Sequence, residues 1–221
     1  MSLSSSQSLI ETEKILTQED EVQIKRVLDY WFYDHDIVFN YKNRWFPGTI
    51  SHNQQQMTDE EIYSKFNELY QLASIKSLTH WQQSMNGTIA LIIILDQFSR
   101  HILRWLGNGG DDQRVSDMVA LEISRSLHTK RSVLNLSVSE YVFSLMPMRH
   151  AFTAIDLRCV LEKLSLKEDI GFQSQELLNK FRKQTTRRLQ HLQDREVVIH
   201  YACRLISYPF VYNMINNMLQ A

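Results

Sequence analysis

The feature that most constrains the fold of this chain is a run of seven apolar residues, 89–95, that continues directly into a polar stretch ending at Arg104. It is the longest unbroken apolar run of the sequence, yet it is far shorter than the roughly 20 residues that a membrane span needs. An apolar segment without a polar face is covered on most sides in a folded protein. We therefore predict a buried central helix whose charged groups gather at one end.

The rest of the sequence is also typical of helices. Only 6 glycines and 3 prolines occur among 221 residues, and few turn-forming residues over this length favour long helices over short strands. Thr17, Thr58 and Ser137 are each followed three residues later by an acidic residue, the pattern of a helix N-cap. Asn86-Gly87 is interpreted as a break before the central run. No segment shows strand-like alternation, so we predict an all-α protein.

The expected architecture is a series of antiparallel helix pairs around the central helix, compatible with a tetratricopeptide-like helical array. No repeat of fixed length is visible, so the sequence alone does not define a regular array. Residues 1–16 begin rich in Ser and Gln and are predicted to form a mobile tail. Residues 17–221 are predicted to form a single helical domain, a length that allows a sizeable buried core.

Charge and cysteine content argue against several partners and locations. The net charge of −1 provides no field that would attract nucleic acid or an anionic membrane. A basic stripe of Lys180, Lys183 and Arg187 is interpreted as a solvated helix face rather than a contact for RNA or an acidic partner. Two cysteines cannot form a disulfide framework, and the start of the chain lacks the pattern of a signal peptide. We therefore expect a cytoplasmic protein outside the membrane, in an oligomeric state that the sequence leaves open.

The charged end of the central run contains the candidate site. Asp96, Arg100 and Arg104 are spaced four apart and would share one helix face. A buried charge must be paired, so an internal ion pair between Asp96 and Arg100 is the preferred interpretation. The alternative is a pocket in which the two arginines bind an anionic ligand. The candidate ligand-binding residues are Asp96, Gln97, Arg100, His101, Arg104 and His150.

Catalytic and metal-binding patterns are missing from the sequence. No two histidines are spaced four apart and no Cys-x-x-Cys pair occurs, so we predict no metal site. The glycine-rich segment 107–110 lacks the Lys-Ser/Thr that follows a phosphate-binding loop. No Gly-x-Ser-x-Gly motif provides a nucleophile. We therefore assign no catalytic residue and no cofactor.

Five short motifs, taken in order, resemble one known family. They are residues 27–32 (Val-Leu-Asp-Tyr-Trp-Phe), 44–46 (Arg-Trp-Phe), Trp81, 95–100 (Leu-Asp-Gln-Phe-Ser-Arg) and 145–150 (Leu-Met-Pro-Met-Arg-His). Their order and spacing are similar to those of the domain-of-unknown-function 924 family, from about residue 20 to about residue 215. The resemblance implies a tetratricopeptide-like, all-helical fold. It implies no activity, because the family has none established.

The chain departs from the family's motifs in a consistent direction. The central motif usually reads Asp-Gln-Phe-Pro-Arg-Asn, and this chain has Ser99 and His101 in place of Pro and Asn. The second motif usually reads Pro-Leu-Glu-His-Ser-Glu, and here Arg149 replaces the first Glu while Ala151 and Phe152 replace Ser-Glu. Asp96, Gln97, Arg100 and His150 are retained, but most of the polar neighbours expected beside them are lost, so a polar pocket built from these motifs would be depleted here. The resemblance therefore argues against catalysis in this member.

The sequence leaves two functions open. The preferred one is a binding or scaffolding module for a protein segment or a small ligand, in which the charged cluster is structural. The alternative is an enzyme, such as a hydrolase, or an anionic small-molecule binder. Its polar cluster would consist of Asp96, Arg100, Arg104 and His150.

Overall fold

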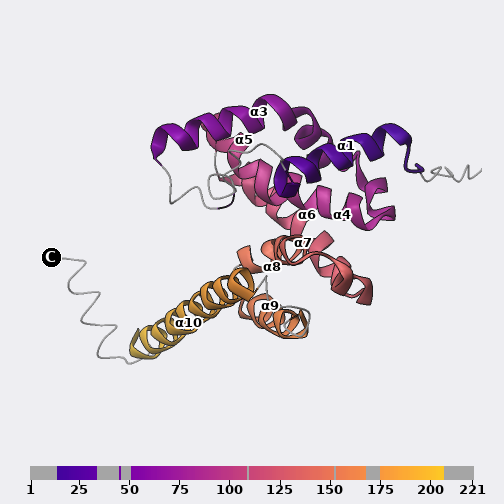
Figure 1. Cartoon of the computed structure of the whole chain (residues 1–221). Coiled ribbons are helices and arrows are strands. Elements are labelled where there is room, and N and C mark those ends of the chain that lie inside the picture. The colour runs from indigo at the N-terminus through magenta and orange to yellow at the C-terminus, as the bar shows by residue number, and fades with distance from the viewer. Residues whose placement is uncertain are drawn as a thin grey trace, which may run out of the picture. The chain divides into compact units, whose positions relative to one another are not determined.

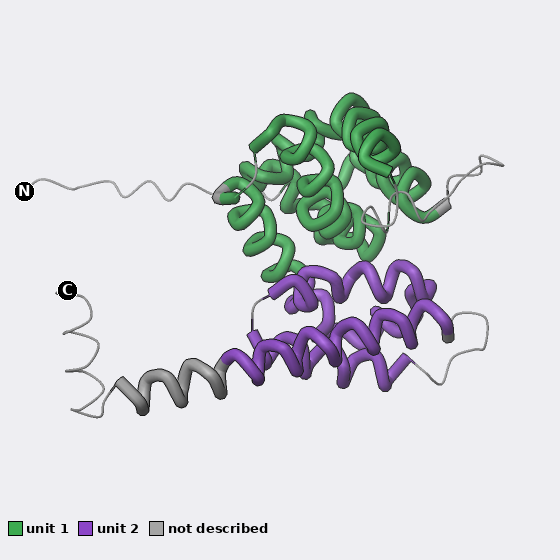
Figure 2. The backbone as a smooth tube through the Cα atoms, turned by 90° about the vertical axis from the view of Figure 1, so that its left-hand side faces the viewer, with its two compact units in different colours: residues 1–123 green, residues 124–221 purple. Residues whose placement is uncertain are grey.

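The computed structural model describes residues 14–33, 45, 51–108, 110–151, 153–167 and 175–206 (Figure 1). Every regular element in these ranges is helical and none is a strand, which confirms the all-α prediction. The chain divides into two compact units, residues 1–123 and 124–221 (Figure 2). The boundary falls within a helix, α6 (Asp111–Leu127). A single domain over residues 17–221 stays a prediction.

The first unit consists of helices that pack around the central run. Its longer helices are α1 (Gln18–Leu28), α3 (His52–Ser74), α4 (Met85–Ile92), α5 (Ser99–Trp105) and the first part of α6. Short π-helical or 3₁₀ turns lie between some of them: η1 (Asp29–Tyr33), η3 (Thr79–Gln83) and η4 (Ile93–Phe98). Helix α1 packs against α4, and α3 packs against η4 and α5. Helix α3 therefore lies along the polar end of the central run.

The central run is helical and buried, as predicted. Elements α4, η4 and α5 follow one another without a break, because the residues at both junctions keep right-handed helical dihedral angles. Every residue from 89 to 95 is at most 2% exposed. In η4 the hydrogen bonds join residues five apart, and such turns inside α-helices are frequent at functional sites. Phe98 of this turn stacks on Phe66 of α3 with 4.5 Å between ring centroids, which holds the two helices together.

Two of the three predicted helix starts are confirmed and one is wrong. The side chains of Thr17 and Ser137 accept hydrogen bonds from the backbone three residues on, as N-caps do. Helix α3 begins well before Thr58, because Ser51 and Gln54 form a capping box of their own. Thr58 lies inside the helix, where its hydroxyl donates to the carbonyl of Gln54 at 2.9 Å. The earlier start brings residues 52–57, most of them polar, into α3.

The second unit contains the remaining helices. They are α7 (Val138–Ser144), α8 (Met146–His150), α9 (Ala154–Lys167) and α10 (Gln175–Ile206), preceded by a 3₁₀ turn, η5 (Arg131–Asn135). Helix α10 packs against α7 and α9, and α8 also packs against α7 and α9. Leu157 and Phe181 are part of the buried core. The ammonium of Lys167 is also buried and donates to the carbonyls of Leu134 and Leu136 at 2.6 and 2.7 Å, which satisfies its charge.

Several predictions stay untested. Residues 1–13 of the predicted mobile tail lie outside the described residues. At its end, the backbones of Lys14 and Leu16 form hydrogen bonds with the side chain of Gln83, at 2.9 and 3.3 Å. The chain from residue 207 on, including Pro209, is also outside the described ranges. The tetratricopeptide-like arrangement stays a prediction beyond the all-α class. No helix in the described ranges has the length and apolarity to cross a membrane.

Candidate functional site

Three titratable or charged side chains meet between α3 and α5. Asp59 of α3 is 3% exposed, and its carboxylate contacts two residues of α5. Arg104 donates through Nε to Oδ2 and through Nη2 to Oδ1, both at 2.6 Å. Nδ1 of His101 lies 2.7 Å from Oδ1. A spacing of three residues places His101 and Arg104 on the same side of α5, the side that faces α3.

The geometry determines the protonation of this cluster. Burial disfavours the ionised carboxyl of Asp59, but the hydrogen bonds and charges of His101 and Arg104 outweigh burial and hold the pKa of Asp59 below its usual range. An ionised carboxylate can only accept, so Nδ1 of His101 carries the hydrogen that it donates to Oδ1. Nη2 of Arg104 lies 3.1 Å from that Nδ1, because both donors converge on the same oxygen.

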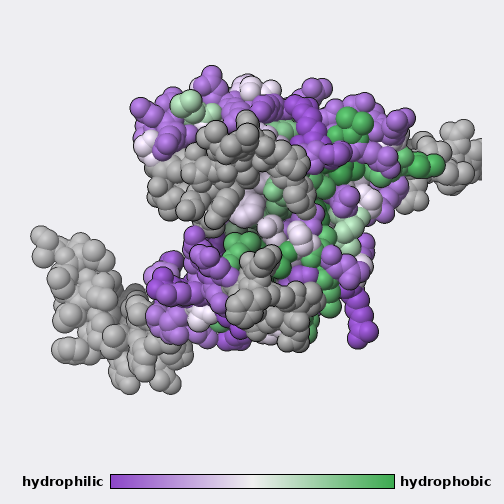
Figure 3. All heavy atoms as spheres, viewed as in Figure 1, coloured by the Kyte–Doolittle hydropathy of each residue, from purple (hydrophilic) through white to green (hydrophobic). Residues whose placement is uncertain are grey.

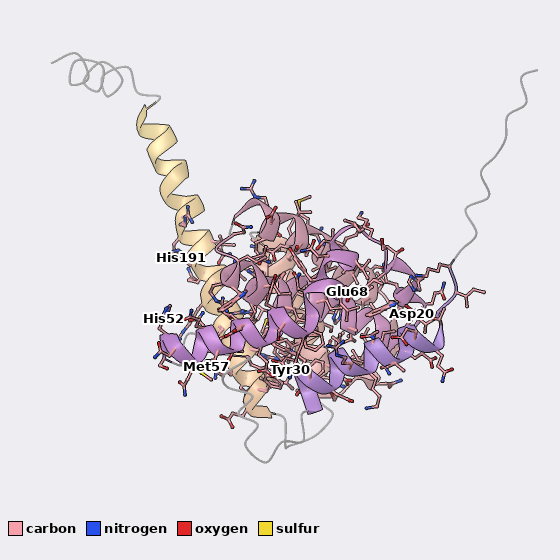
Figure 4. All side chains as sticks on the ribbon, turned by 90° about the horizontal axis from the view of Figure 1, so that it is seen from above. Asp20, Tyr30, His52, Met57, Glu68 and His191 are labelled. Carbon is pink, nitrogen blue, oxygen red and sulfur yellow. The ribbon has the colours of Figure 1, made fainter. Side chains whose placement is uncertain are left out.

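A pocket opens beside this cluster. Its volume is about 340 Å³, at the lower end of the roughly 300–1,000 Å³ of ligand sites. It is lined by the beginning of α3 and the end of α5, through His52, Gln55, Gln56, Asp59, Arg104 and Trp105. Figure 4 shows this end of α3 from above, with His52 and Met57 labelled. The side of α3 that is visible in Figure 3 is mainly hydrophilic.

A second cluster joins the central helix to α6. Asp96 is fully buried, and its carboxylate accepts hydrogen bonds from the amide of Gln97 and, at 3.4 Å, from the guanidinium of Arg100. Arg100 makes a shorter bond, 2.7 Å, to Asp117 of α6. Gln113 also donates to Asp117, at 2.8 Å. The internal pair of Asp96 and Arg100 that the spacing predicted is therefore present, and Arg100 extends it to α6.

The predicted site residues do not form one cluster in the first unit. One group contains Asp96, Gln97 and Arg100, and the other contains His101 and Arg104. The two arginines are four apart as expected, but they bond to acids on different helices. His150 belongs to the second unit, at the end of α8, where its backbone carbonyl accepts a hydrogen bond from Arg188 of α10 at 3.1 Å.

Sequence reasoning missed the part of the site that α3 contributes. Asp59 lies 45 residues before Arg104, so no spacing rule connects them. One signal could have found it: Asp59 is in helical register with the apolar residues Ile62 and Phe66, and an acid on an apolar face needs a positively charged partner. The interpretation of Thr58 as an N-cap hid this signal, since it placed Asp59 in an exposed first turn.

Titratable groups of the second unit are held by structural contacts. Arg125 donates to both carboxylate oxygens of Asp156, at 2.9 and 2.7 Å. Burial raises the pKa of the nearby Cys159 thiol, which makes it a poor nucleophile. In the ranges that the structure describes, no group of three or more His, Cys, Asp or Glu side chains is arranged to hold a metal ion.

Replacing Arg104 with methionine is expected to lower the free energy of unfolding by about 2 kcal/mol. Methionine keeps aliphatic bulk but removes two of the three hydrogen bonds to the buried carboxylate of Asp59. Breaking a buried pair costs about 3–5 kcal/mol, and the effect is smaller here because the Arg104 side chain is 38% exposed and water screens the pair. Urea denaturation followed by tryptophan fluorescence measures this, because all four tryptophans lie in the first unit.

The control is the double variant Asp59→Asn/Arg104→Met. It removes the buried negative charge together with its partner, so at least half of the lost stability is expected to return. Equal losses in the single and double variants would contradict the view that an unpaired charge causes the destabilisation.

The fold and the site define an all-helical protein with a small polar pocket at one end of its central helix. The chain belongs to the family described as "Bacterial protein of unknown function (DUF924)", whose model matches residues 27–201, and its altered motifs make it a divergent member. It is similar to a solved protein of unknown function, ATU0120 from Agrobacterium tumefaciens, with a TM-score of 0.55 and 18% identity over 76% of this chain and 84% of that chain. No curated protein matches the chain. At this identity the solved structure supports the fold alone.

Proposed function

We propose that this chain is a cytoplasmic binding module and that the pocket between α3 and α5 takes a small polar ligand. A tetratricopeptide-like arrangement of the helices is part of the proposal, because helical arrays commonly serve as binding surfaces. The pocket volume of about 340 Å³ suits a small molecule or one side chain of a protein segment. We prefer the small molecule, since the polar groups converge on one hollow rather than along a groove.

One observation carries this proposal: the pocket is lined by polar groups that have no hydrogen-bond partner among the described residues. The side-chain amides of Gln55 and Gln56 have no hydrogen-bond partner in the described part of the chain. The same is true of Nη1 of Arg104, whose Nε and Nη2 bond to Asp59. A concave site with a few convergent polar groups is the usual form of a ligand pocket. The lining therefore supports binding.

A second candidate, an enzyme that uses His101 as a base, is favoured by one contact. Asp59 fixes the imidazole of His101 with its hydrogen on Nδ1, as in carboxylate-oriented general bases. The side chain of His101 is only 5% exposed, however, and it does not line the pocket. A general base must be within hydrogen-bond reach of its substrate. Binding is therefore preferred over catalysis.

A thermal-shift screen of the full chain against small polar metabolites tests the proposal. A ligand at ten times its Kd adds about 1.4 kcal/mol to the folded state, which raises the Tm by roughly 3–6 °C. The shift is expected to disappear in the double variant Gln55→Ala/Gln56→Ala, because both side chains line the pocket and neither makes a side-chain hydrogen bond within the described residues.

The matched control is Gln71→Ala, which removes an exposed amide near the other end of α3. It is expected to keep the full ligand-induced shift. A metabolite that raises the Tm of the double variant as much as that of the wild type would place its binding site elsewhere. A screen without any stabilising metabolite would also count against the proposal.

A further inference from the structure

We propose that the group recognised in this pocket is a carboxylate, carried by a small organic acid. This inference rests on the proposed binding function and adds the chemical class of the ligand. Three properties of the lining support it: which polar groups are already bonded, how the guanidinium of Arg104 is held, and how the charges of the lining balance.

Within the described residues, the lining has unbonded hydrogen-bond donors, whereas its carboxylate acceptor, Asp59, is already bonded. Asp59 is the acidic residue among the lining side chains that the structure describes, and three donors from His101 and Arg104 already occupy its oxygens. A cationic ligand would have to compete with these short bonds for a carboxylate that is 3% exposed. Nη1 of Arg104, by contrast, has two N–H groups without a partner in the described residues, and Gln55 and Gln56 add amide donors. The pocket therefore suits a group that accepts hydrogen bonds.

The guanidinium of Arg104 is fixed before any ligand arrives. Its two bonds to Asp59, both 2.6 Å long, hold the guanidinium plane in one orientation, so the directions of the remaining N–H groups are fixed as well. Its side chain remains 38% exposed, and it lines the pocket. A preorganised planar donor pair loses little conformational entropy on binding, and it matches the geometry of a carboxylate.

The charge of the lining suits a singly charged carboxylate better than a phosphate group. The charges of Arg104 and Asp59 cancel each other, and the other lining residues in the described ranges offer amide, imidazole and indole groups. Phosphate sites usually contain several cations or a nest of backbone N–H groups, whereas the described part of this lining contributes one guanidinium. A carboxylate needs only one guanidinium edge and neutral amide donors. Trp105 adds an apolar wall for the carbon chain of the acid.

The test is a titration of the ¹⁵N-labelled full chain, followed in NMR spectra by the side-chain signals of Gln55, Gln56 and Arg104 Nε. The probes are succinate, its diamide succinamide, inorganic phosphate, and acetyl-trialanine with a free carboxylate. Succinate is expected to move all three signals, with succinamide and phosphate binding at least tenfold more weakly. Acetyl-trialanine tests whether the carboxylate belongs to a small acid or to the C-terminus of a protein. If it bound ten times more tightly than succinate, the pocket would be assigned to a protein C-terminus and the small-acid assignment would be overturned.

Two matched variants locate the contact. Arg104→Lys keeps the positive charge but loses the planar donor pair, so succinate binding is expected to weaken at least tenfold. Arg100→Lys makes the same change one helical turn earlier, where the guanidinium bonds to Asp117 and does not line the pocket, and it is expected to bind succinate like the wild type. Far-UV circular dichroism would check that both variants fold. Gln56→Ala is a second probe and is expected to weaken succinate binding about threefold. Because the Gln56 side chain makes no hydrogen bond within the described chain, such a loss would report its contact with the ligand.

The outcomes separate this inference from the proposed function. Succinamide that binds as tightly as succinate overturns the carboxylate assignment and leaves the pocket's binding role in place. Signals that no probe moves also overturn the assignment, while the metabolite screen decides the binding role by itself. Equal weakening in Arg104→Lys and Arg100→Lys would show that the acid binds outside the pocket.

Discussion

Replacing Gly87 with alanine is expected to destabilise the first unit by about 3 kcal/mol or more. A Cβ atom at this position would lie well under 3.0 Å from the backbone carbonyl oxygen of Trp81 and 2.9 Å from Oγ of Ser84. That carbonyl belongs to η3, and the buried Trp81 side chain is held by a 2.7 Å hydrogen bond from its Nε1 to Asp20. Overpacking costs about 1–3 kcal/mol and more where the obstacle cannot move, so a backbone obstacle gives a value at the upper end.

The sign of the effect distinguishes two roles for Gly87. The sequence pattern Asn86-Gly87 is typical of a chain break, but the structure places both residues in the first turn of α4, after the N-cap Ser84. In an unobstructed helix alanine is about 1 kcal/mol better than glycine, so the substitution would stabilise the protein. A loss of stability therefore reports the close approach between α4 and η3 rather than a need for chain flexibility.

Urea denaturation followed by tryptophan fluorescence measures this change in the first unit. The control is Asn86→Ala, which alters the exposed neighbour in the same helical turn and is expected to change stability by no more than about 0.5 kcal/mol. A Gly87→Ala protein that is as stable as the wild type would mean that η3 shifts without loss, and it would refute the packing role of Gly87.

The fold could be predicted where burial and capping follow from local patterns. The apolar run at 89–95 and the caps at Thr17 and Ser137 depend on residues close together in the chain, and the structure confirms them. The start of α3 was wrong because Ser51 and Thr58 satisfy the same local rule. The choice between them depends on how the intervening turn packs, which the pattern does not contain.

Only one side of the candidate site could be predicted. Arg100 and Arg104 stand out because charges at the end of a buried run need partners. Their partners, Asp117 and Asp59, lie 17 and 45 residues away and on two different helices. Tertiary packing of α5 against α3 and α6 creates these pairs, so the spacing of residues within one helix cannot identify them.

Two residues that replace the usual family motif residues make structural contacts in this chain. His101, in place of Asn, bonds to Asp59 at 2.7 Å. Arg149, in place of Glu, lies over the ring of Phe181 at 5.4 Å and donates to Gln184 at 3.1 Å. The pocket itself is lined largely by α3, outside the altered motifs. The altered motifs are therefore compatible with a binding pocket at this end of α3.

Acid is expected to destabilise the second unit by about 3 kcal/mol between pH 6.5 and pH 4, through His128. This residue is 5% exposed, and its Nε2 lies 2.9 Å from the hydroxyl of Ser144. Because that hydroxyl donates to the carbonyl of Tyr141 at 2.7 Å, it accepts from Nε2–H. Nδ1 is buried without a hydrogen-bond partner in the described residues, so a second proton there would have no acceptor. The imidazole is therefore neutral in the folded protein.

The direction of the pH effect follows from the two states of His128. Burial, and after it the positive charge of Lys163, lowers the pKa of His128 from 6.5 to about 4 in the folded protein. The unfolded chain keeps a value near 6.5, so between these values it binds more protons than the folded chain, and the free energy of unfolding falls as the pH falls. Asp20 and Asp59, whose pKa values are held below their usual range, lose their stabilisation only below about pH 4. The two effects therefore occupy different pH windows.

Urea denaturation followed by far-UV circular dichroism at pH 7, 5.5 and 4 measures this dependence. His128→Gln retains an amide that can donate to Ser144 but does not titrate, so most of the loss between pH 7 and pH 4 is expected to disappear. His191→Gln removes an exposed histidine of α10 and is expected to keep the wild-type slope. If His128→Gln lost as much stability between pH 7 and pH 4 as the wild type, a group other than His128 would have to take up the extra proton on unfolding.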